Sequence, residues 1–305
     1  MNISSLPLSD YSRNYLLRMD IDYYLGIYRR CLRRMLRYLD MSPETVTLVD
    51  YGGGHGLLGV TAKQLGVGQV IYVDYNPQAC DAVRVISDAL GAGPDHILCG
   101  DSALLRQWCA DNAVVPHALL GMDVIEHIYR LEPFFADLFA INPTMRMLFT
   151  TGSTPYNPRV VRRLHRIMQA DEAKFYLQRR THIASHYPQL KSVDLDTWAS
   201  ATRGLNLDDT LLAVETHTPF DPGDAYNTCD PVTSSWTERI LPIAAYRRLL
   251  EPYGATLAIR NGYYNQTRRN LKGLLSRLPN LLLATNRLHA LAPFIILEIA
   301  PAKKS

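Results

Sequence analysis

The chain has 305 residues, of which 47% are hydrophobic and 20% are charged. This composition is typical of a folded globular protein and excludes a disordered or fibrous chain. Lys and Arg together number 32 against 29 Asp and Glu, and the resulting net charge of +3 is too small to indicate a nucleic-acid partner.

The five cysteines form no C-x-x-C pair, so the sequence indicates neither a zinc knuckle nor a secreted disulfide framework. The first residues lack the basic segment and the apolar segment that a signal peptide needs. Near the other end, the apolar run 292–299 is too short to span a bilayer. We therefore expect a cytoplasmic protein with no signal peptide and no integral membrane segment.

Apolar residues recur near helical spacing between Tyr11 and Asp40, with arginines between them. This pattern predicts a helical lead-in or lid over residues 1–45. From 46 to 151, short β-branched runs alternate with helical segments. The alternation predicts five parallel strands wound with helices. The predicted strands are 46–51, 69–73, 97–99, 117–120 and 146–150, and the predicted helices are 57–65, 77–90 and 103–110.

Between 152 and 235 the chain becomes helical and polar, with candidate helix starts at Asn157-Pro158 and at Asp171. We interpret this part as an insertion that caps the substrate site. The last part, 236–305, returns to the sheet with a helix at 241–253 and strands at 255–259 and 294–299. The sequence therefore predicts an α/β protein with a doubly wound, Rossmann-like, seven-stranded and mostly parallel sheet, carrying a helical insertion after the fifth strand.

A glycine-rich turn follows the first predicted strand. Asp50 ends that strand, and the next helix is preceded by Gly52, Gly53, Gly54 and Gly56. Glycine permits positive φ and close approach of a ligand, and a helix N-terminus presents unpaired N–H groups. The turn is therefore suited to a ligand carboxylate, while Asp50 either fixes the turn or accepts, through water, from a ligand ammonium. The alternative is a tight turn without a ligand.

Carboxylates also follow the next strands. Asp74 ends the second strand, where a carboxylate can accept from both hydroxyls of a ribose. Asp101 and Ser102 follow the third strand, where they either read an adenine amino group or cap the next helix. The fourth strand leads into Asp123 and His127.

In this order, Asp50-x-Gly52-x-Gly54-x-Gly56, Asp74, Gly100-Asp101 and the segment 118–128 resemble the motifs of the class I S-adenosylmethionine-dependent methyltransferases. The resemblance covers about residues 46–151, and 236–299 is similar to the closing helix and strands of that family. It implies S-adenosylmethionine as the cofactor. The implied contacts are the glycine turn for the methionine part, Asp74 for the ribose, Tyr75 for the adenine face, and Asp101 with Ser102 for the adenine edge, while Asp123 contacts the cofactor or holds its loop.

Two other functions stay open. The segment Gly54-His-Gly56-Leu-Leu-Gly59 also fits a dinucleotide fingerprint, with Asp74 near the expected distance, which would make the chain an NAD(P)-dependent oxidoreductase. Asp50 and two further glycines precede that fingerprint, which argues against it. A methyltransferase-like scaffold that binds the nucleoside without turnover is the non-enzymatic alternative.

The acceptor is expected to be a small molecule, in one interpretation an anionic one, that is methylated on a hydroxyl. His127 is the candidate general base, worth roughly 10²–10⁴-fold in rate, although Glu126 and His127 could instead brace the following helix. Tyr156 and the insertion's His182 and His186 are expected to line the acceptor pocket. The spacing of the two histidines would also suit a metal with His165 or His217 as third ligand, but without a carboxylate motif we predict no metal.

The segment from Arg260 to Arg287 is basic and contains no Asp or Glu. It would suit an anionic acceptor or an interfacial helix, and a packed helix pair with solvated basic faces is the favoured interpretation. Its cationic residues are Arg260, Arg268, Arg269, Lys272, Arg277 and Arg287.

Overall fold

The computed structural model describes residues 6–266 and 276–301. The chain divides into two compact units. Unit 1 comprises Met1–Ile125, Glu132–Thr151 and Ala244–Ser305, and unit 2 comprises Glu126–Leu131 and Gly152–Ile243. The segment after the fourth strand is therefore shared, because Asp123 lies in unit 1 and His127 lies in unit 2.

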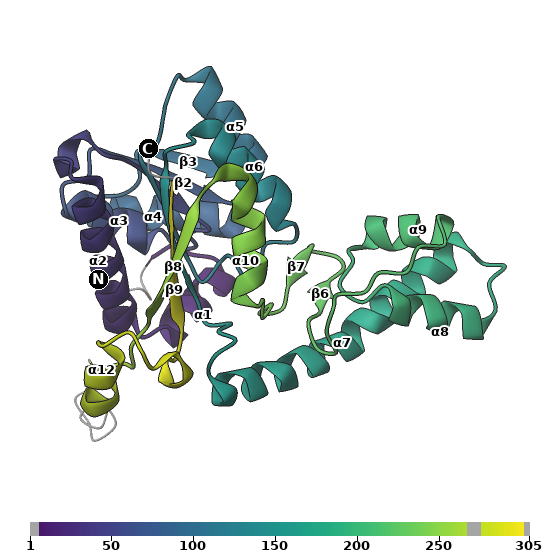
Figure 1. The fold of residues 1–305 in the computed structure, drawn as a ribbon. Coiled ribbons are helices and arrows are strands. Elements are labelled where there is room, and N and C mark those ends of the chain that lie inside the picture. The colour runs from purple at the N-terminus through teal and green to yellow at the C-terminus, as the bar shows by residue number, and fades with distance from the viewer. Residues whose placement is uncertain (1–5, 267–275, 302–305) are drawn as a thin grey trace. The chain divides into compact units, whose positions relative to one another are not determined.

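Unit 1 is built on a seven-stranded sheet with the order β3-β2-β1-β4-β5-β9-β8 (Figure 1). The first five strands pair in parallel, and β9 is antiparallel to both β5 and β8. This topology confirms the predicted doubly wound, mostly parallel sheet. The strands are β1 (Thr47–Tyr51), β2 (Gln69–Asp74), β3 (His96–Cys99), β4 (Ala118–Met122), β5 (Arg146–Thr151), β8 (Thr256–Asn261) and β9 (Ile295–Ala300).

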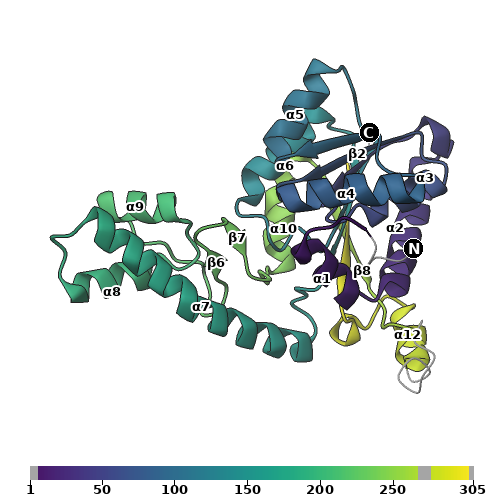
Figure 2. The same ribbon diagram turned by 180° about the vertical axis from the view of Figure 1, so that it is seen from behind.

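Helices cover both faces of this sheet, as the two opposite views show (Figures 1 and 2). Buried side chains of α2 and α3 pack on Leu48, Val70 and Leu148 of one face. On the other face, Phe134 and Phe135 of α6 contact Phe149 of β5. The helices of the sheet layers are α2 (Ile21–Leu39), α3 (Leu57–Gln64), α4 (Pro77–Leu90), α5 (Ser102–Asp111), α6 (Leu131–Ile141) and α10 (Ile243–Leu250).

The helical lead-in is made of two helices. α1 (Asp10–Arg18) ends where Met19 turns extended, and α2 starts again after Asp20. α1 buries Ser12 and Leu16, and Leu16 lies in a cluster with side chains of α3 and α4. The break therefore lets α1 lie beside the turn that precedes α3, while α2 packs on the sheet.

Two features of the helices differ from the sequence analysis. α6 was not predicted, and it supplies much of the core on its face of the sheet. Asp171 as a helix start is wrong, because α7 (Pro158–His186) runs through it without interruption. Asn157 caps that helix through its side chain, and no Gly or Pro occurs between 159 and 187 to end it sooner.

Unit 2 consists of three helices and a short hairpin. α7, α8 (Ser192–Ala201) and α9 (Leu207–Glu215) share a buried cluster around Ile183 and Ala199. The Arg179 side chain is fully buried and pairs with Glu172 at 2.5 Å, while its Nε donates to the Ala199 carbonyl. The hairpin is formed by β6 (Cys229–Asp230) and β7 (Ser235–Trp236).

The C-terminal basic segment is described only in part. Arg260 pairs with Glu298 of β9, and Arg277 begins the short helix α12 (Arg277–Leu283). Arg268, Arg269 and Lys272 lie outside the described residues. Within the described part of the chain, no helix is both long enough and apolar enough to cross a membrane.

Candidate functional site

Asp50, in β1, holds the turn between β1 and α3 in place. Its Oδ2 accepts a hydrogen bond of 2.9 Å from the Gly59 amide in the first turn of α3. The Asp50 side chain is buried, and this burial raises its pKa to about 7 although the Gly59 amide acts in the opposite direction. One of the two roles left open for Asp50, the bracing of the turn, is present in the structure, and its contact with a ligand ammonium stays a prediction.

The glycines of the turn differ in what surrounds them. Gly52, Gly54 and Gly56 all have positive φ, of 64°, 53° and 73°. An added Cβ would overlap the Val124 side chain at Gly52 and the Val83 side chain at Gly56, whereas at Gly54 it would meet nothing within 4 Å. Packing thus explains why positions 52 and 56 require glycine. The space over Gly54 is open, and we call it the Gly54 cradle.

Asp74, the last residue of β2, also binds the glycine turn. Its Oδ2 accepts from the Gly54 amide at 2.9 Å, and its Oδ1 accepts from the Asn76 amide at 2.9 Å. Burial raises the pKa of Asp74, against the effect of these two amides. Because each carboxylate oxygen has a second lone pair, Asp74 can still accept from a ligand.

The first turn of α3 offers donors at the same place. The amides of Leu57 and Leu58 lie too early in the helix to have an intrahelical acceptor, while the Gly59 amide already donates to Asp50. Two helix-terminal N–H groups that follow the glycine turn directly in the chain suit an amino-acid carboxylate, and a carboxylate at Asp74 fits a pair of ribose hydroxyls. The residues present therefore fit S-adenosylmethionine, as the sequence predicts.

The other predicted cofactor residues lie at the ends of neighbouring strands. Tyr75 is 63% exposed, directly after Asp74. Asp101 caps α5 by accepting from the amides of Ala103 and Leu104. Ser102 is buried, and its hydroxyl donates to Asp137 at 2.7 Å. The capping alternative for Asp101 is thus realised in the structure, and any contact with adenine stays a prediction.

Asp123 follows β4 in an unusual backbone conformation. Its φ is 50°, a left-handed value that is uncommon outside glycine, and its amide donates to the Thr150 carbonyl at 3.0 Å. The Thr150 hydroxyl donates to Asp123 Oδ1 at 3.1 Å. These bonds tie the end of β4 to β5 and hold the loop that carries Asp123.

His127 is held within unit 2. Its Nδ1 lies 2.8 Å from the Trp236 carbonyl, and the His127 carbonyl accepts from the Trp236 amide. A carbonyl can only accept, so Nδ1 carries a proton in this contact, and Nε2 is the nitrogen left for any other partner.

The remaining predicted residues are also in unit 2. Tyr156 lies just before α7, and its amide donates to the Thr154 hydroxyl. His182 and His186 lie one turn apart on α7, with ring centroids 4.5 Å apart. His165 stacks on Tyr226 instead. Across the described residues, no group of three or more His, Cys, Asp or Glu side chains could hold a metal ion.

One contact at the turn was not predicted. Tyr15 of α1 stacks on His55, with ring centroids 4.7 Å apart and an interplanar angle of 21°. Burial lowers the pKa of His55 to about 4, so this ring is neutral at pH 7. The two residues are 40 positions apart in the sequence, and no local sequence pattern predicts that they are in contact.

No protein-family model matches the chain. Local sequence matches exist to ribosomal protein L11 methyltransferases. That of Dechloromonas aromatica is 40% identical over 60 residues, which are 19% of this chain and 20% of the relative. That of Aeromonas hydrophila is 48% identical over 46 residues, 15% of each protein. The chain thus spans at most a fifth of the length of these two relatives.

Two solved structures extend over more of the chain at low identity. A plantazolicin methyltransferase in complex with a triazolic desmethylPZN analog and SAH is 12% identical, covers 99% of this chain and 90% of its own, and has a TM-score of 0.45. A magnesium protoporphyrin IX methyltransferase from Synechocystis with bound SAH is 14% identical, covers 98% and 91%, and has a TM-score of 0.44.

Proposed function

We propose that this chain, which has the class I S-adenosylmethionine-dependent methyltransferase fold, transfers a methyl group from S-adenosylmethionine to a hydroxyl of a small-molecule acceptor. The observation that carries the proposal is the Gly54 cradle. Gly54 is the one glycine of the turn with positive φ whose Cβ direction is open, and its amide donates to the Asp74 carboxylate at the end of β2. The local matches to methyltransferases support the same activity.

Each residue of the turn then has a definite task. Asp50 holds α3 in place through the Gly59 amide, so that the Leu57 and Leu58 amides point at a ligand carboxylate. Asp74 accepts from the ribose hydroxyls with the lone pairs that the Gly54 and Asn76 amides leave available. The cofactor supplies a methyl group that is already activated on a sulfonium.

Because the donor is activated, the chain's main task is to align the acceptor and to exclude water. His127 is proposed as the base that takes the proton of the acceptor hydroxyl on Nε2, since the Trp236 carbonyl keeps the other nitrogen protonated. Tyr156, His182 and His186 stay predictions for the acceptor side. The L11 methyltransferases share too little of their length with this chain for their acceptor to be transferred to it.

Calorimetry with the full chain tests the cofactor. S-adenosylhomocysteine should bind with one site per chain, and NADH should give no heat at the same concentration. Tight binding of NADH without binding of S-adenosylhomocysteine would instead support the oxidoreductase alternative. Release of S-adenosylhomocysteine from S-adenosylmethionine in the presence of hydroxylated acceptors separates an enzyme from a nucleoside-binding scaffold, because the scaffold would bind and release nothing.

A further inference from the structure

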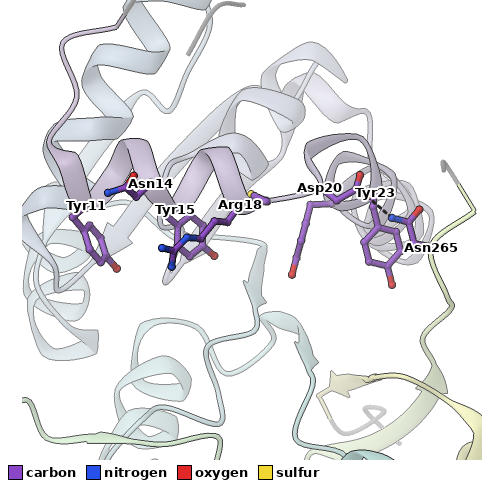
Figure 3. A pocket seen from close by; sticks show the side chains of 9 residues that line it. Tyr11, Asn14, Tyr15, Arg18, Asp20, Tyr23 and Asn265 are labelled. Atoms are coloured by element: carbon purple, nitrogen blue, oxygen red, sulfur yellow. Dashed lines mark hydrogen bonds between the residues drawn. The ribbon is translucent and has the colours of Figure 1, made fainter. Parts of the chain in front are cut away.

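A pocket of about 720 Å³ opens between α1 and the start of α2, within unit 1 (Figure 3). Tyr11 and Tyr15 are four residues apart, as are Asn14 and Arg18, and Arg18 follows Tyr15 by three, which places these side chains on one face of α1. Figure 3 shows Tyr11, Tyr15 and Arg18 pointing to the same side of that helix. The other lining residues are Met19, Asp20, Tyr23, Tyr24 and Asn265.

Core packing does not require these aromatic side chains. The opposite face of α1 carries the buried residues Ser12 and Leu16, which face the core. Tyr11 and Tyr15 are 52% and 50% exposed. Exposed aromatic rings that line a cavity are typical of a surface that binds a flat, apolar ligand, since a soluble protein otherwise places few of them together.

The charges of the pocket are arranged asymmetrically. The Asp20 carboxylate accepts from the Asn265 side-chain amide at 2.6 Å (Figure 3). Arg18, by contrast, forms no ion pair with any residue that the structure describes. A guanidinium without a carboxylate partner, one helical turn from Asn14, is suited to an acid group, which it can bind through two parallel hydrogen bonds.

The pocket adjoins the cofactor turn. Tyr15 lines the pocket and at the same time stacks on His55 between Gly54 and Gly56. Burial raises the pKa of Tyr15, and the negative charges of Asp123 and Asp74 act in the same direction. A ligand in this pocket would therefore lie next to a cofactor held by the turn.

We propose that this pocket is the acceptor site, and that it selects a planar aromatic acid whose ring lies against Tyr11 and Tyr15 and whose acid group binds Arg18. This inference rests on the proposed function. It places acceptor recognition on α1, within unit 1.

The test uses 2-naphthoate and its neutral counterpart 2-naphthamide as probes, titrated by calorimetry into the full chain saturated with S-adenosylhomocysteine. The wild type should bind 2-naphthoate at least about tenfold more tightly than 2-naphthamide, because a hydrogen bond to a charged group is worth that much. Arg18→Met should remove the difference between the probes. Arg29→Met is the matched control, since Arg29 is an exposed arginine outside the pocket, and it should preserve the difference.

Two further variants test the aromatic wall. Tyr15→Ala should lower the affinity for both probes. Tyr15→Phe should bind both probes as tightly as the wild type does, because the ring and not the hydroxyl makes the contact. Equal affinity of the wild type for the two probes, or an unchanged difference in Arg18→Met, would overturn the proposal. Failure of S-adenosylhomocysteine to bind would overturn the proposed function instead, and the same probes titrated into the chain alone would still report on the pocket.

Discussion

Replacing Gly54 by alanine should weaken cofactor binding at a small cost in stability. Gly54 has a φ of 53°, and an alanine in a left-handed conformation costs about 1–2 kcal/mol. The added Cβ meets nothing within 4 Å in the protein, so no packing cost is added. It would project into the Gly54 cradle, where crowding of about 1–3 kcal/mol lowers the affinity for S-adenosylhomocysteine roughly 5- to 150-fold.

Two matched variants separate the backbone cost from the ligand effect. Gly91→Ala, at the C-terminal end of α4, changes a glycine with a φ of 60° and an equally open Cβ direction, so it should cost the same stability and leave binding unchanged. Gly56→Ala would also overlap the Val83 side chain, so its free energy of unfolding should fall by about 2–5 kcal/mol. Urea denaturation and calorimetry with S-adenosylhomocysteine measure both quantities. Wild-type affinity in Gly54→Ala would refute this reasoning.

Three other variants test single carboxylates and the candidate base. Because burial raises the pKa of Asp50 to about 7, the folded protein binds a proton there more tightly than the unfolded chain, so wild-type stability should fall by up to about 4 kcal/mol as pH rises from 4 to 7. Asp50→Asn should lack that part of the pH dependence in urea denaturation, and identical slopes would contradict the account. Asp74→Asn should weaken the binding of S-adenosylhomocysteine by about 1.5–3 kcal/mol in calorimetry, and unchanged affinity would show that Asp74 does not bind the ribose. His127→Ala should lower turnover about 10²–10⁴-fold near neutral pH with unchanged cofactor affinity. The loss of turnover should become smaller at higher pH, where the acceptor hydroxyl itself ionises. Full turnover in this variant would show that His127 is not the base and that the enzyme acts by aligning the acceptor.

The sheet could be predicted because its strands are short apolar runs that end at glycines or carboxylates. Residues 46–51 and 69–73 lie within one residue of β1 and β2, and the helix 77–90 coincides with α4, whose start is marked by Asn76-Pro77. α6 was missed although its sequence carries a helical signal. Large apolar side chains recur at 131, 134, 135, 138 and 139, and all five are buried in the structure. Pro133 argues against a helix only in its interior, and here it lies in the first turn.

The glycine turn could be predicted from the sequence and the pocket beside α1 could not, and both outcomes have the same physical reason. The turn is local: Asp50, the glycines and the first residues of α3 are adjacent in sequence, and their residue types follow from backbone conformation. The pocket depends on the break after Arg18, on α1 lying over His55, and on Asn265 reaching Asp20 from far along the chain. Contacts of that range leave no periodic signal.

A crystal structure of the chain with S-adenosylhomocysteine would show whether the glycine turn holds the cofactor. We expect both ribose hydroxyls within about 3 Å of the Asp74 carboxylate and the amino-acid carboxylate at a similar distance from the Leu57 and Leu58 amides. The Asp50 to Gly59 hydrogen bond should remain as it is without ligand. Electron density for the ligand elsewhere, or a ribose that leaves Asp74 bound only to the Gly54 and Asn76 amides, would contradict it.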